Sequence, residues 1–304
     1  MRTFLPSRFA RPVLAGLLLL AAWPAFACAP AGWTKEKLLG LRDSGFVVAD
    51  AGKRDALAKD LLACLADPDP VLRDKVAFDA LSTWLRGKQL SDATRASLLV
   101  DLLPRIDPKA ADTDGFGKPF ATLVLSEVAR TDRIAAWMTP AQREQLVQAA
   151  ATYVEGVRDY RGFDDREGWR HGVAHGADLL MQLALNPKLD KPQLDRLLAA
   201  ATSQIAANDG HAYVFGESER LLRPVLFIAA RGLHTPEEWT AWTQKLVDPA
   251  PMKAWSEAYS SQAGLARRHN LVLFLMLLRA ESAGNADPTM TALAGGAEAG
   301  LKAL

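Results

Sequence analysis

The chain has 304 residues, of which 49% are hydrophobic, and its 36 basic residues nearly balance its 35 acidic ones, giving a net charge of +1. A chain of this length and apolar content can bury a sizeable core, either as one large domain or as an elongated repeat array. The near-neutral charge gives no reason to expect a protein that binds nucleic acid or an anionic membrane surface.

Residues 1–27 have the pattern of a secretory signal peptide. Three arginines precede an apolar run over residues 13–22, and Ala25-Phe26-Ala27 fits the small-x-small cleavage pattern. The apolar run is too short to span a membrane, which takes about 20 apolar residues. We therefore expect an exported, periplasmic protein with no integral membrane segment after cleavage. Because the leader holds three basic and no acidic residues, the mature chain would carry a net charge of −2.

The two cysteines of the chain are Cys28 and Cys64. An exported protein meets an oxidising compartment, so a disulfide between them is chemically permitted, and a free Cys28 is equally open. Cys28 would also be the first mature residue, which raises lipid attachment as a further alternative. Lipoprotein signals usually carry Leu three residues before the cysteine and a small residue next, whereas Ala25 and Phe26 stand here. Soluble export is therefore the favoured interpretation.

Apolar residues recur with the helical period from Lys35 almost to Ala283, and no window shows the sustained alternation that is typical of strands. Thr139 before Pro140 and Thr235 before Pro236 mark helix starts, with Gln or Glu three residues after each threonine. The predicted helices cover residues 34–43, 53–66, 70–87, 92–106, 118–136, 140–160, 165–185, 191–207, 218–231, 236–246, 251–261 and 266–282. The short connections make neighbouring helices antiparallel, and we expect one all-α domain over residues 28–284.

The clearest helical hairpin lies over residues 61–81. Two amphipathic segments are separated by Asp67-Pro68-Asp69-Pro70, and Arg73 follows the turn. This arrangement resembles a HEAT repeat. The later hairpins are irregularly spaced, so the sequence predicts an α/α superhelix of stacked antiparallel helical hairpins, either HEAT-like or closed like a toroid, rather than a regular array.

The stretch from Asp164 to Gln182 holds two of the five histidines of the chain. If it forms one helix, six polar side chains share a narrow stripe at 100° per residue: Asp164, Glu167, His171, His175, Asp178 and Gln182. The opposite, packing face carries Trp169, Val173, Ala177, Leu180 and Ala184. A third row consists of Gly168, Gly172 and Gly176. Glycine costs a helix about 1 kcal/mol relative to alanine, so we expect another backbone or a ligand to approach closely along this row.

His171 and His175 stand four residues apart, the separation at which two imidazoles on a helix can bind one divalent metal such as zinc, with Asp178 or Glu167 as a third ligand. The residue after His171 is glycine where zinc peptidases place a glutamate base, which disfavours that mechanism. One alternative is a ligand-binding or catalytic stripe without metal. The other is a polar seam in which the histidines hydrogen-bond to carboxylates and hold helices together. Asp164 and Glu167 also fit a capping box, which would occupy both side chains.

A second candidate segment covers residues 208–222. A glycine-bounded loop with His211 and Tyr213 leads into a helix whose first turn holds two glutamates, one of them Glu217. Acidic residues in a first turn are favoured by the helix dipole whether or not they act. The segment follows the histidine helix by one hairpin, so Glu217 or Arg220 is placed to reach the same groove.

Two segments near the C-terminus carry less information. The segment Arg267-Arg268-His269-Asn270 is interpreted as the solvated start of an apolar helix. Cations at a helix start oppose the helix dipole, so a carboxylate that lies opposite would account for their presence. After Gly284 the composition shifts to Ala, Gly and Thr, so residues 285–304 are predicted to form a weakly ordered tail or a final helix.

Two stretches of the sequence resemble the signatures of a bacterial family known as domain of unknown function 2785. They are Gly168-Trp169-Arg170-His171-Gly172-Val173-Ala174-His175-Gly176-Ala177-Asp178 and Gly216-Glu217-Ser218-Glu219-Arg220. The resemblance covers most of the mature chain. It implies an all-helical fold and no established activity. The residues that match motif positions are Trp169, His171, His175, Asp178, Glu217 and Arg220. The Ala-His-Gly piece is also similar to the zinc-bearing helical toroid of lanthionine cyclases, whose cysteine ligands have no counterparts around residues 120–260.

The favoured functional interpretation is an exported helical-repeat protein that binds a small molecule or an envelope protein or peptide through a groove lined by His171, His175, Asp178 and Glu217. The alternative is a metal-dependent or His-dependent hydrolase or lyase on a helical toroid. In it His175 acts as a general base or metal ligand and Asp178 orients it. The third interpretation is a purely structural repeat protein whose polar stripe fixes helix register.

Overall fold

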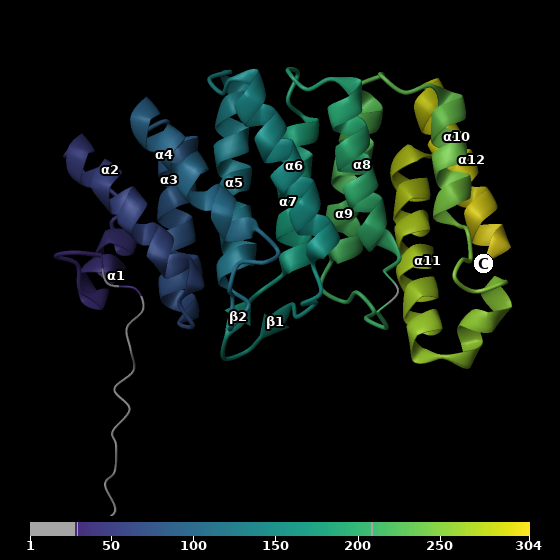
Figure 1. The fold of residues 1–304 in the computed structure, drawn as a ribbon, viewed down its shortest axis with the longest axis horizontal. Helices are drawn as coiled ribbons and strands as arrows, with labels where there is room; N and C mark the ends of the chain where they lie inside the picture. Colours follow the sequence, from purple (N-terminus) through teal and green to yellow (C-terminus); the bar gives the residue numbers. More distant parts are fainter. Residues whose placement is uncertain (1–27, 29, 208) are drawn as a thin grey trace, which may run out of the picture.

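The computed structural model describes residues 28, 30–207 and 209–304, so the expected signal peptide lies outside the described residues. The described helices pack side by side in a long row, with the N-terminal helices at one end and the C-terminus at the other (Figure 1). The predicted all-α superhelix of stacked hairpins is confirmed. The row is open at both ends, so it is HEAT-like in outline rather than closed like a toroid.

The α-helices are α1 Lys35–Asp43, α2 Ala51–Asp60, α3 Asp79–Arg86, α4 Asp92–Leu102, α5 Gly117–Ile134, α6 Pro140–Gly156, α7 Gly172–Ala184, α8 Lys191–Ile205, α9 Glu217–Ala230, α10 Pro236–Leu246, α11 Gln262–Ser282 and α12 Pro288–Ala303. Shorter 3-10 helices cover Leu61–Ala66, Leu103–Ile106 and Trp255–Ser260, and a π-helical stretch covers Val71–Phe78. The capping signals at Thr139 and Thr235 form complete capping boxes, as does Asp190 before α8. Residues 285–304 contain α12, which buries Leu293 and Ala297.

The layer that matters for function consists of α3, α5, α7 and α9, each packed against the next. A second layer lies behind it, in which α4 packs on α5, α6 packs on α7 and α8, and α8 packs on α9. Residues far apart in the sequence therefore meet on neighbouring helices of one layer. No helix in the described part of the chain has the length and apolar character needed to cross a membrane.

The N-terminal end of the described chain is tied to the first hairpin by a disulfide between Cys28 and Cys64, both of which are buried. The arginine of that hairpin, Arg73, is completely buried. Its Nη1 donates to the Asp67 carbonyl oxygen at 2.9 Å, and its Nη2 donates to the Glu167 carbonyl oxygen at 2.7 Å. Arg73 thus closes its own turn and also holds the segment that leads into α7.

The predicted helix over residues 165–185 is wrong in its first part. Phe163–Asp164 (β1) and Gly168–Trp169 (β2) form a short antiparallel hairpin, and α7 begins only at Gly172. The side chain of Asp164 accepts hydrogen bonds from the backbone N–H groups of Arg166 and Glu167 at 2.9 and 3.0 Å, which is a turn and not the capping box of a helix. Gly168 has a φ of 74°, a left-handed conformation that interrupts any helix.

Candidate functional site

Helix α7 starts at a strained residue. His171 is its N-cap with φ 56° and ψ 40°, a left-handed conformation that is uncommon for a residue with a Cβ and costs about 1 kcal/mol or more. Its backbone N–H donates to the Arg161 carbonyl oxygen at 3.1 Å, and its carbonyl oxygen accepts from the His175 N–H at 3.0 Å. The surrounding backbone therefore holds the strained conformation, and the His171 ring is aimed inward.

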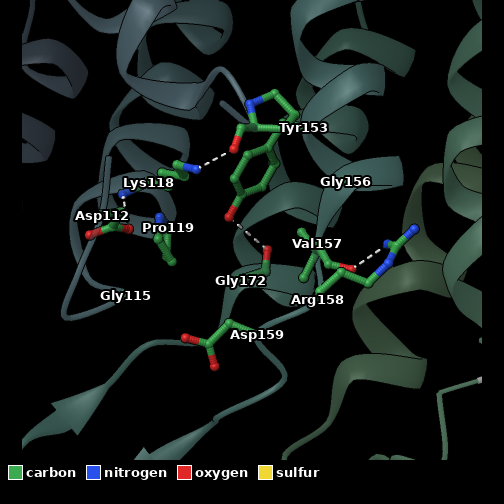
Figure 2. Close-up of a pocket in the computed structure, with 11 residues that line it drawn as sticks. Asp112, Gly115, Lys118, Pro119, Tyr153, Gly156, Val157, Arg158, Asp159 and Gly172 are labelled. Carbon is green, nitrogen blue, oxygen red and sulfur yellow. Dashed lines mark hydrogen bonds between the residues drawn. The ribbon is translucent and has the colours of Figure 1, made fainter. Parts of the chain in front are cut away.

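The back of α7 packs as predicted for its helical residues. Val173, Ala177, Leu180 and Ala184 are buried, whereas Trp169 lies on β2. The close approach expected at the glycines comes from α6. A Cβ on Gly176 would lie 2.7 Å from Val154 Cγ2, and the Tyr153 hydroxyl donates to the Gly172 carbonyl oxygen at 3.3 Å on the wall of a pocket of about 220 Å³ (Figure 2). At Gly176 the third row is therefore a helix-packing seam, whereas Gly172 lines the pocket.

The His171 ring is buried between aromatic groups. It stacks on Trp169 with ring centroids 4.6 Å apart, and its edge contacts the His175 ring at 5.8 Å. Its Nε2 atom is buried and has no hydrogen-bond partner within the described residues; Glu217 Oε1 lies 3.9 Å away, beyond hydrogen-bond distance. Burial, together with the charge of Arg220, lowers the pKa of His171 to about 4. The imidazole is therefore neutral at physiological pH.

His175 is fixed by α5. Its Nδ1 atom lies 3.2 Å from the Pro119 carbonyl oxygen, a contact that assigns the ring proton to Nδ1 and leaves Nε2 as an acceptor. The ring packs against the edge of Phe120 at 5.2 Å. Burial and the neighbouring His171 lower the pKa of His175 to about 3. A neutral, oriented imidazole results.

Asp178 and Arg220 form an ion pair between α7 and α9. Burial raises the pKa of the Asp178 carboxyl, although the charge of Arg220 acts in the opposite direction. Glu217, which lies three residues before Arg220 on α9, is 2% exposed, and its Oε2 accepts from the Phe215 N–H at 2.9 Å. The predicted residues therefore meet at the α7–α9 contact in two groups. His171 lies beside Trp169, His175 and Glu217, and Asp178 pairs with Arg220.

A cleft of about 340 Å³ opens along α3, α5, α7 and α9 beside these residues. Its lining side chains are Phe78, Arg86, Leu123, Ser126, Glu127, His175, Asp178, Met181, Gln182, Arg220 and Arg223. Glu127 forms an ion pair with Arg86, and Arg223 pairs with Glu219. Sequence reasoning missed Arg86, Glu127 and Arg223. The one signal for these residues in the sequence was Glu127, a charged side chain on the face of α5 that the apolar pattern predicts to be buried.

The predicted metal set is not formed. In the described parts of the chain, no three His, Cys, Asp or Glu side chains lie together so that they could hold a metal ion. His171 is the N-cap of α7 and has a left-handed backbone, and Asp178 is engaged by Arg220. Glu167 forms an ion pair with Arg170 on the hairpin, away from the histidines. The expectation that Glu167 and Asp164 share the histidine stripe is therefore wrong.

The loop before α9 is held structurally. His211 stacks on Tyr160 at 5.2 Å, and the Tyr213 hydroxyl donates to the Gln204 carbonyl oxygen at 2.8 Å. Asn270 on α11 accepts from the Tyr213 N–H at 2.8 Å and donates to the His211 carbonyl oxygen at 2.9 Å. These contacts position Glu217 at the start of α9.

The interpretation of residues 267–270 as a solvated helix start is wrong. Helix α11 begins at Gln262, so these residues lie inside it, and Arg267 and Asn270 are buried. Within the described residues Arg267 forms no ion pair; it donates to the carbonyl oxygens of Pro249 and Asp248 at 2.7 and 3.1 Å. Both polar side chains therefore fix loops against α11.

Comparison with known proteins gave one match. Residues 102–279 match the model of a family described as "Protein of unknown function (DUF2785)". The matched range contains all six candidate site residues. No curated protein and no solved structure matches the chain.

Proposed function

The chain belongs to the family described as "Protein of unknown function (DUF2785)", and we propose that it is an exported helical-repeat protein that binds an anionic small molecule in the cleft between α3, α5, α7 and α9. The ligand contacts His175, Arg220 and Arg223. His171 and Glu217 support this wall from the α7–α9 contact, and Trp169 covers His171.

The observation that carries this proposal is the set of three arginines that line the cleft, Arg86, Arg220 and Arg223. Each is paired with a carboxylate, and two of these carboxylates, Glu127 and Asp178, are nearly buried. The lowered pKa of His175 keeps the imidazole neutral, so it acts as a hydrogen-bonding group and not as an additional charge. Arginine binds carboxylate and phosphate groups through paired hydrogen bonds, which favours an anionic ligand.

The Arg86 and Arg220 side chains are also accessible. They are 57% and 35% exposed, whereas the Glu127 and Asp178 carboxylates with which they pair are 6% and 12% exposed. An incoming anion therefore meets guanidinium groups first. The buried carboxylates orient those groups from behind, which is a common way to prepare a binding site in advance.

Export is supported by the disulfide between Cys28 and Cys64. Disulfides persist in oxidising compartments and are rare in the cytosol. A sulfur atom that is bonded to Cys64 is not available for a lipid thioether, so the disulfide favours soluble export over lipid attachment at Cys28. Mass spectrometry of the secreted or periplasmic fraction tests this: the expected mass is that of residues 28–304 with two hydrogens missing and no acyl chain.

The binding proposal is tested by thermal unfolding of the mature protein with succinate, citrate and inorganic phosphate as probes. A ligand at a hundredfold excess over its Kd stabilises the native state by about 2.7 kcal/mol, so the Tm should rise by several degrees with at least one probe. The rise should be lost in Arg220→Ala and Arg223→Ala. It should persist in the control Arg196→Ala, which breaks a comparable ion pair with Glu155 between α8 and α6. No rise with any probe, or an equal rise in the arginine variants, would overturn the proposal.

A second candidate, a His-dependent hydrolase, is favoured by one observation, the buried Nε2 atom of His171 without a hydrogen-bond partner and 3.9 Å from Glu217. A neutral imidazole with a ring nitrogen that accepts no hydrogen bond has the protonation state of a general base. Hydrolysis of a panel of ester and amide substrates that is lost in His171→Gln and retained in Arg196→Ala would support this candidate over binding alone.

A further inference from the structure

The cleft between α3, α5, α7 and α9 holds a histidine beside its arginines. The arginine side chains can only donate hydrogen bonds, so they meet the anionic group of a ligand. His175 lines the same cleft, and an imidazole nitrogen can either donate or accept. The protonation of this ring therefore decides which other group the ligand carries beside its negative charge.

The main chain of α5 fixes the tautomer of His175. Its Nδ1 atom lies 3.2 Å from the Pro119 carbonyl oxygen, and a carbonyl oxygen can only accept, so Nδ1 carries a proton. The T-shaped contact with Phe120, at 5.2 Å between ring centroids, opposes rotation of the ring. Because burial lowers the pKa of His175 to about 3, the ring holds only that one proton at neutral pH. Its Nε2 atom is left with a lone pair.

The two histidines of the site differ in whether a ligand can reach such a lone pair. His171 Nε2 is sealed from solvent, and the described lining of the cleft includes His175 but not His171. His175 Nε2 also has no hydrogen-bond partner within the described residues, yet it is not one of the sealed atoms. A molecule in the cleft can therefore donate a hydrogen bond to His175 Nε2 without any movement of the protein.

Neighbouring groups in the cleft also accept hydrogen bonds. The Ser126 hydroxyl donates to the Leu123 carbonyl oxygen at 2.7 Å, so its oxygen has only lone pairs left for a ligand. Asp178 is paired with Arg220 as a carboxylate. A ligand with carboxylates alone would place further lone pairs against His175 Nε2. A ligand with a hydroxyl group supplies the missing proton.

The spacing along α7 sets where that hydroxyl group lies. His175 and Asp178 are three residues apart, so they share one face of the helix with a rise of about 4.5 Å between them. Arg220 is held beside Asp178 by their ion pair. A ligand that reaches both His175 and Arg220 therefore carries its hydroxyl group a few ångströms from its anionic group, as when the hydroxyl group is one or two carbons from a carboxylate.

We infer that the ligand of the cleft is a small hydroxycarboxylate, whose carboxylate binds Arg220 and Arg223 and whose hydroxyl group donates a hydrogen bond to His175 Nε2. This inference rests on the proposed function, because it concerns the same cleft. It adds the chemical class of the ligand and the residue that selects it. His175 determines the specificity, and the Pro119 carbonyl oxygen positions its ring.

The test compares L-malate, D-malate and succinate, which share a four-carbon dicarboxylate skeleton and differ in one hydroxyl group. Titration calorimetry of the mature protein at pH 7.5 measures each Kd. At least one malate enantiomer should bind about 10-fold more tightly than succinate, because succinate leaves His175 Nε2 without a donor. If succinate binds as tightly as both malates, or if only inorganic phosphate binds, the inference fails and the proposed function stands. If no anion binds, both fail.

Variants at His175 test whether this residue recognises the hydroxyl group. His175→Leu removes the acceptor, so the preference for malate over succinate should fall to about 1. His175→Gln places an amide oxygen near the position of Nε2 and should recover part of the preference, and the control Arg196→Ala should keep all of it. A folded His175→Leu variant with the wild-type preference would overturn the inference. If the variants do not fold, the comparison of malate with succinate on the wild-type protein still decides.

Proton uptake separates this inference from an alternative, in which the bound anion protonates His175. An imidazolium would donate from Nε2 to a carboxylate, and the ligand would need no hydroxyl group. Calorimetry in HEPES and in Tris, whose ionisation enthalpies differ, measures the protons taken up. We expect the same enthalpy of malate binding in both buffers. Proton uptake that is present in the wild type and absent in His175→Leu would overturn the inference.

Discussion

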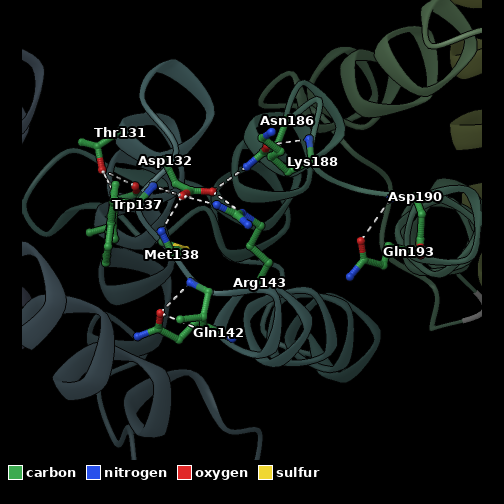
Figure 3. Close-up of polar contacts among 12 residues, drawn as sticks. Thr131, Asp132, Trp137, Met138, Gln142, Arg143, Asn186, Lys188, Asp190 and Gln193 are labelled. Carbon is green, nitrogen blue, oxygen red and sulfur yellow. Dashed lines mark hydrogen bonds and ion pairs between the residues drawn. The ribbon is translucent and has the colours of Figure 1, made fainter.

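Two buried polar clusters lie at opposite ends of the contact between α5 and α7, and they differ in how completely their hydrogen bonds are satisfied. At the C-terminal end, Asp132 accepts five hydrogen bonds, from the N–H groups of Trp137 and Met138, from both Nε and Nη2 of Arg143, and from Asn186 Nδ2 (Figure 3). All of these distances lie between 2.7 and 2.9 Å. Burial by itself raises the pKa of Asp132, but these donors outweigh it and hold the pKa below its usual range.

At the N-terminal end, the cluster of His171, His175 and Asp178 lacks that completeness. His171 has a strained backbone and an unpartnered Nε2, and the pKa of Asp178 is raised by burial in spite of Arg220. The first cluster, which we call the Asp132 cluster, holds helices together, and its carboxylate is fully hydrogen-bonded. The second, the His175 cluster, contains a ring nitrogen without a hydrogen-bond partner and lies beside an open cleft. A buried polar group that the fold does not satisfy points to a ligand more strongly than one that it does.

The largest expected effect is at the Asp132 cluster. Asp132→Asn leaves the buried Arg143 guanidinium without its charge partner and places an amide N–H group against other donors, so we expect a loss of about 3–5 kcal/mol in the free energy of unfolding. Urea denaturation measures this. Binding of the small-anion probes to the remaining folded protein should be unchanged. A loss below about 1 kcal/mol would show that the Asp132 cluster does not hold the helices together, and the contrast with the His175 cluster would be wrong.

The pH dependence of stability should reveal the His175 cluster. His171 and His175 have pKa values lowered to about 4 and about 3, from about 6.5 in the unfolded chain. Between about pH 6.5 and pH 4, the two histidines bind protons in the unfolded state but not in the folded state. Each histidine therefore lowers the free energy of unfolding by about 1.4 kcal/mol for every unit by which the pH falls in this range. The two contributions overlap because the rings are in contact.

The variant His175→Gln removes one of these two contributions and keeps a polar side chain. Its free energy of unfolding, measured by urea denaturation at pH 7, 6 and 5, should fall less steeply with decreasing pH than that of the wild type. The carboxyls with raised pKa values, Asp67, Asp74, Asp79 and Asp178, act in the opposite direction in both proteins and cancel in the difference. Parallel curves would mean that His175 is not a buried neutral group.

A smaller effect is expected from the seam behind the His175 cluster. Gly176→Ala places a Cβ 2.7 Å from Val154 Cγ2 and 3.2 Å from Tyr153 Cε1. The gain of about 1 kcal/mol in helix propensity is offset by an overpacking cost of about 1–3 kcal/mol, so we expect a net loss of about 1 kcal/mol and weaker binding of the small anion. The matched control is Gly295→Ala on α12, where no atom lies within 4 Å of the new Cβ and stability should rise by up to about 1 kcal/mol. A stabilised Gly176→Ala variant would contradict the close packing of α6 on α7.

The smallest effect on stability is expected from Asp178→Asn, the aspartate-to-asparagine substitution in the His175 cluster. Asp178→Asn removes a carboxylate whose pKa is already raised by burial, and Arg220 remains partly in water, so the free energy of unfolding should change by less than about 1 kcal/mol. The cleft also becomes more positive. The small-anion probe should therefore bind several-fold more tightly, as measured by calorimetry, whereas tighter binding is not expected for Asp132→Asn. A loss of binding in Asp178→Asn would show that Asp178 contributes more by orienting Arg220 than it costs by its charge.

Most of the helices could be predicted because their signals are local. Thr139, Asp190 and Thr235 each satisfy the first N–H groups of a helix within four residues, and the apolar period marks the face that is buried. The residues before α7 did not follow these local signals. Gly168, which the helical row includes, allows a left-handed turn. Asp164 and Glu167 fit a helix cap by spacing, but they belong to a hairpin that Arg73 holds from a distant part of the chain.

The sequence alone determined the helical class of this protein, most of its helix boundaries, and the set of His, Asp, Glu and Arg residues that meet on α7 and α9, because periodicity and capping act over one or two turns. The tertiary structure decided the rest. It brought Arg86 and Glu127 from α3 and α5 to one cleft, added Asn186 to the nearer partners of Asp132, and left His171 Nε2 without a partner. Asn186 lies 54 residues from Asp132 along the chain, and no local pattern records such a contact.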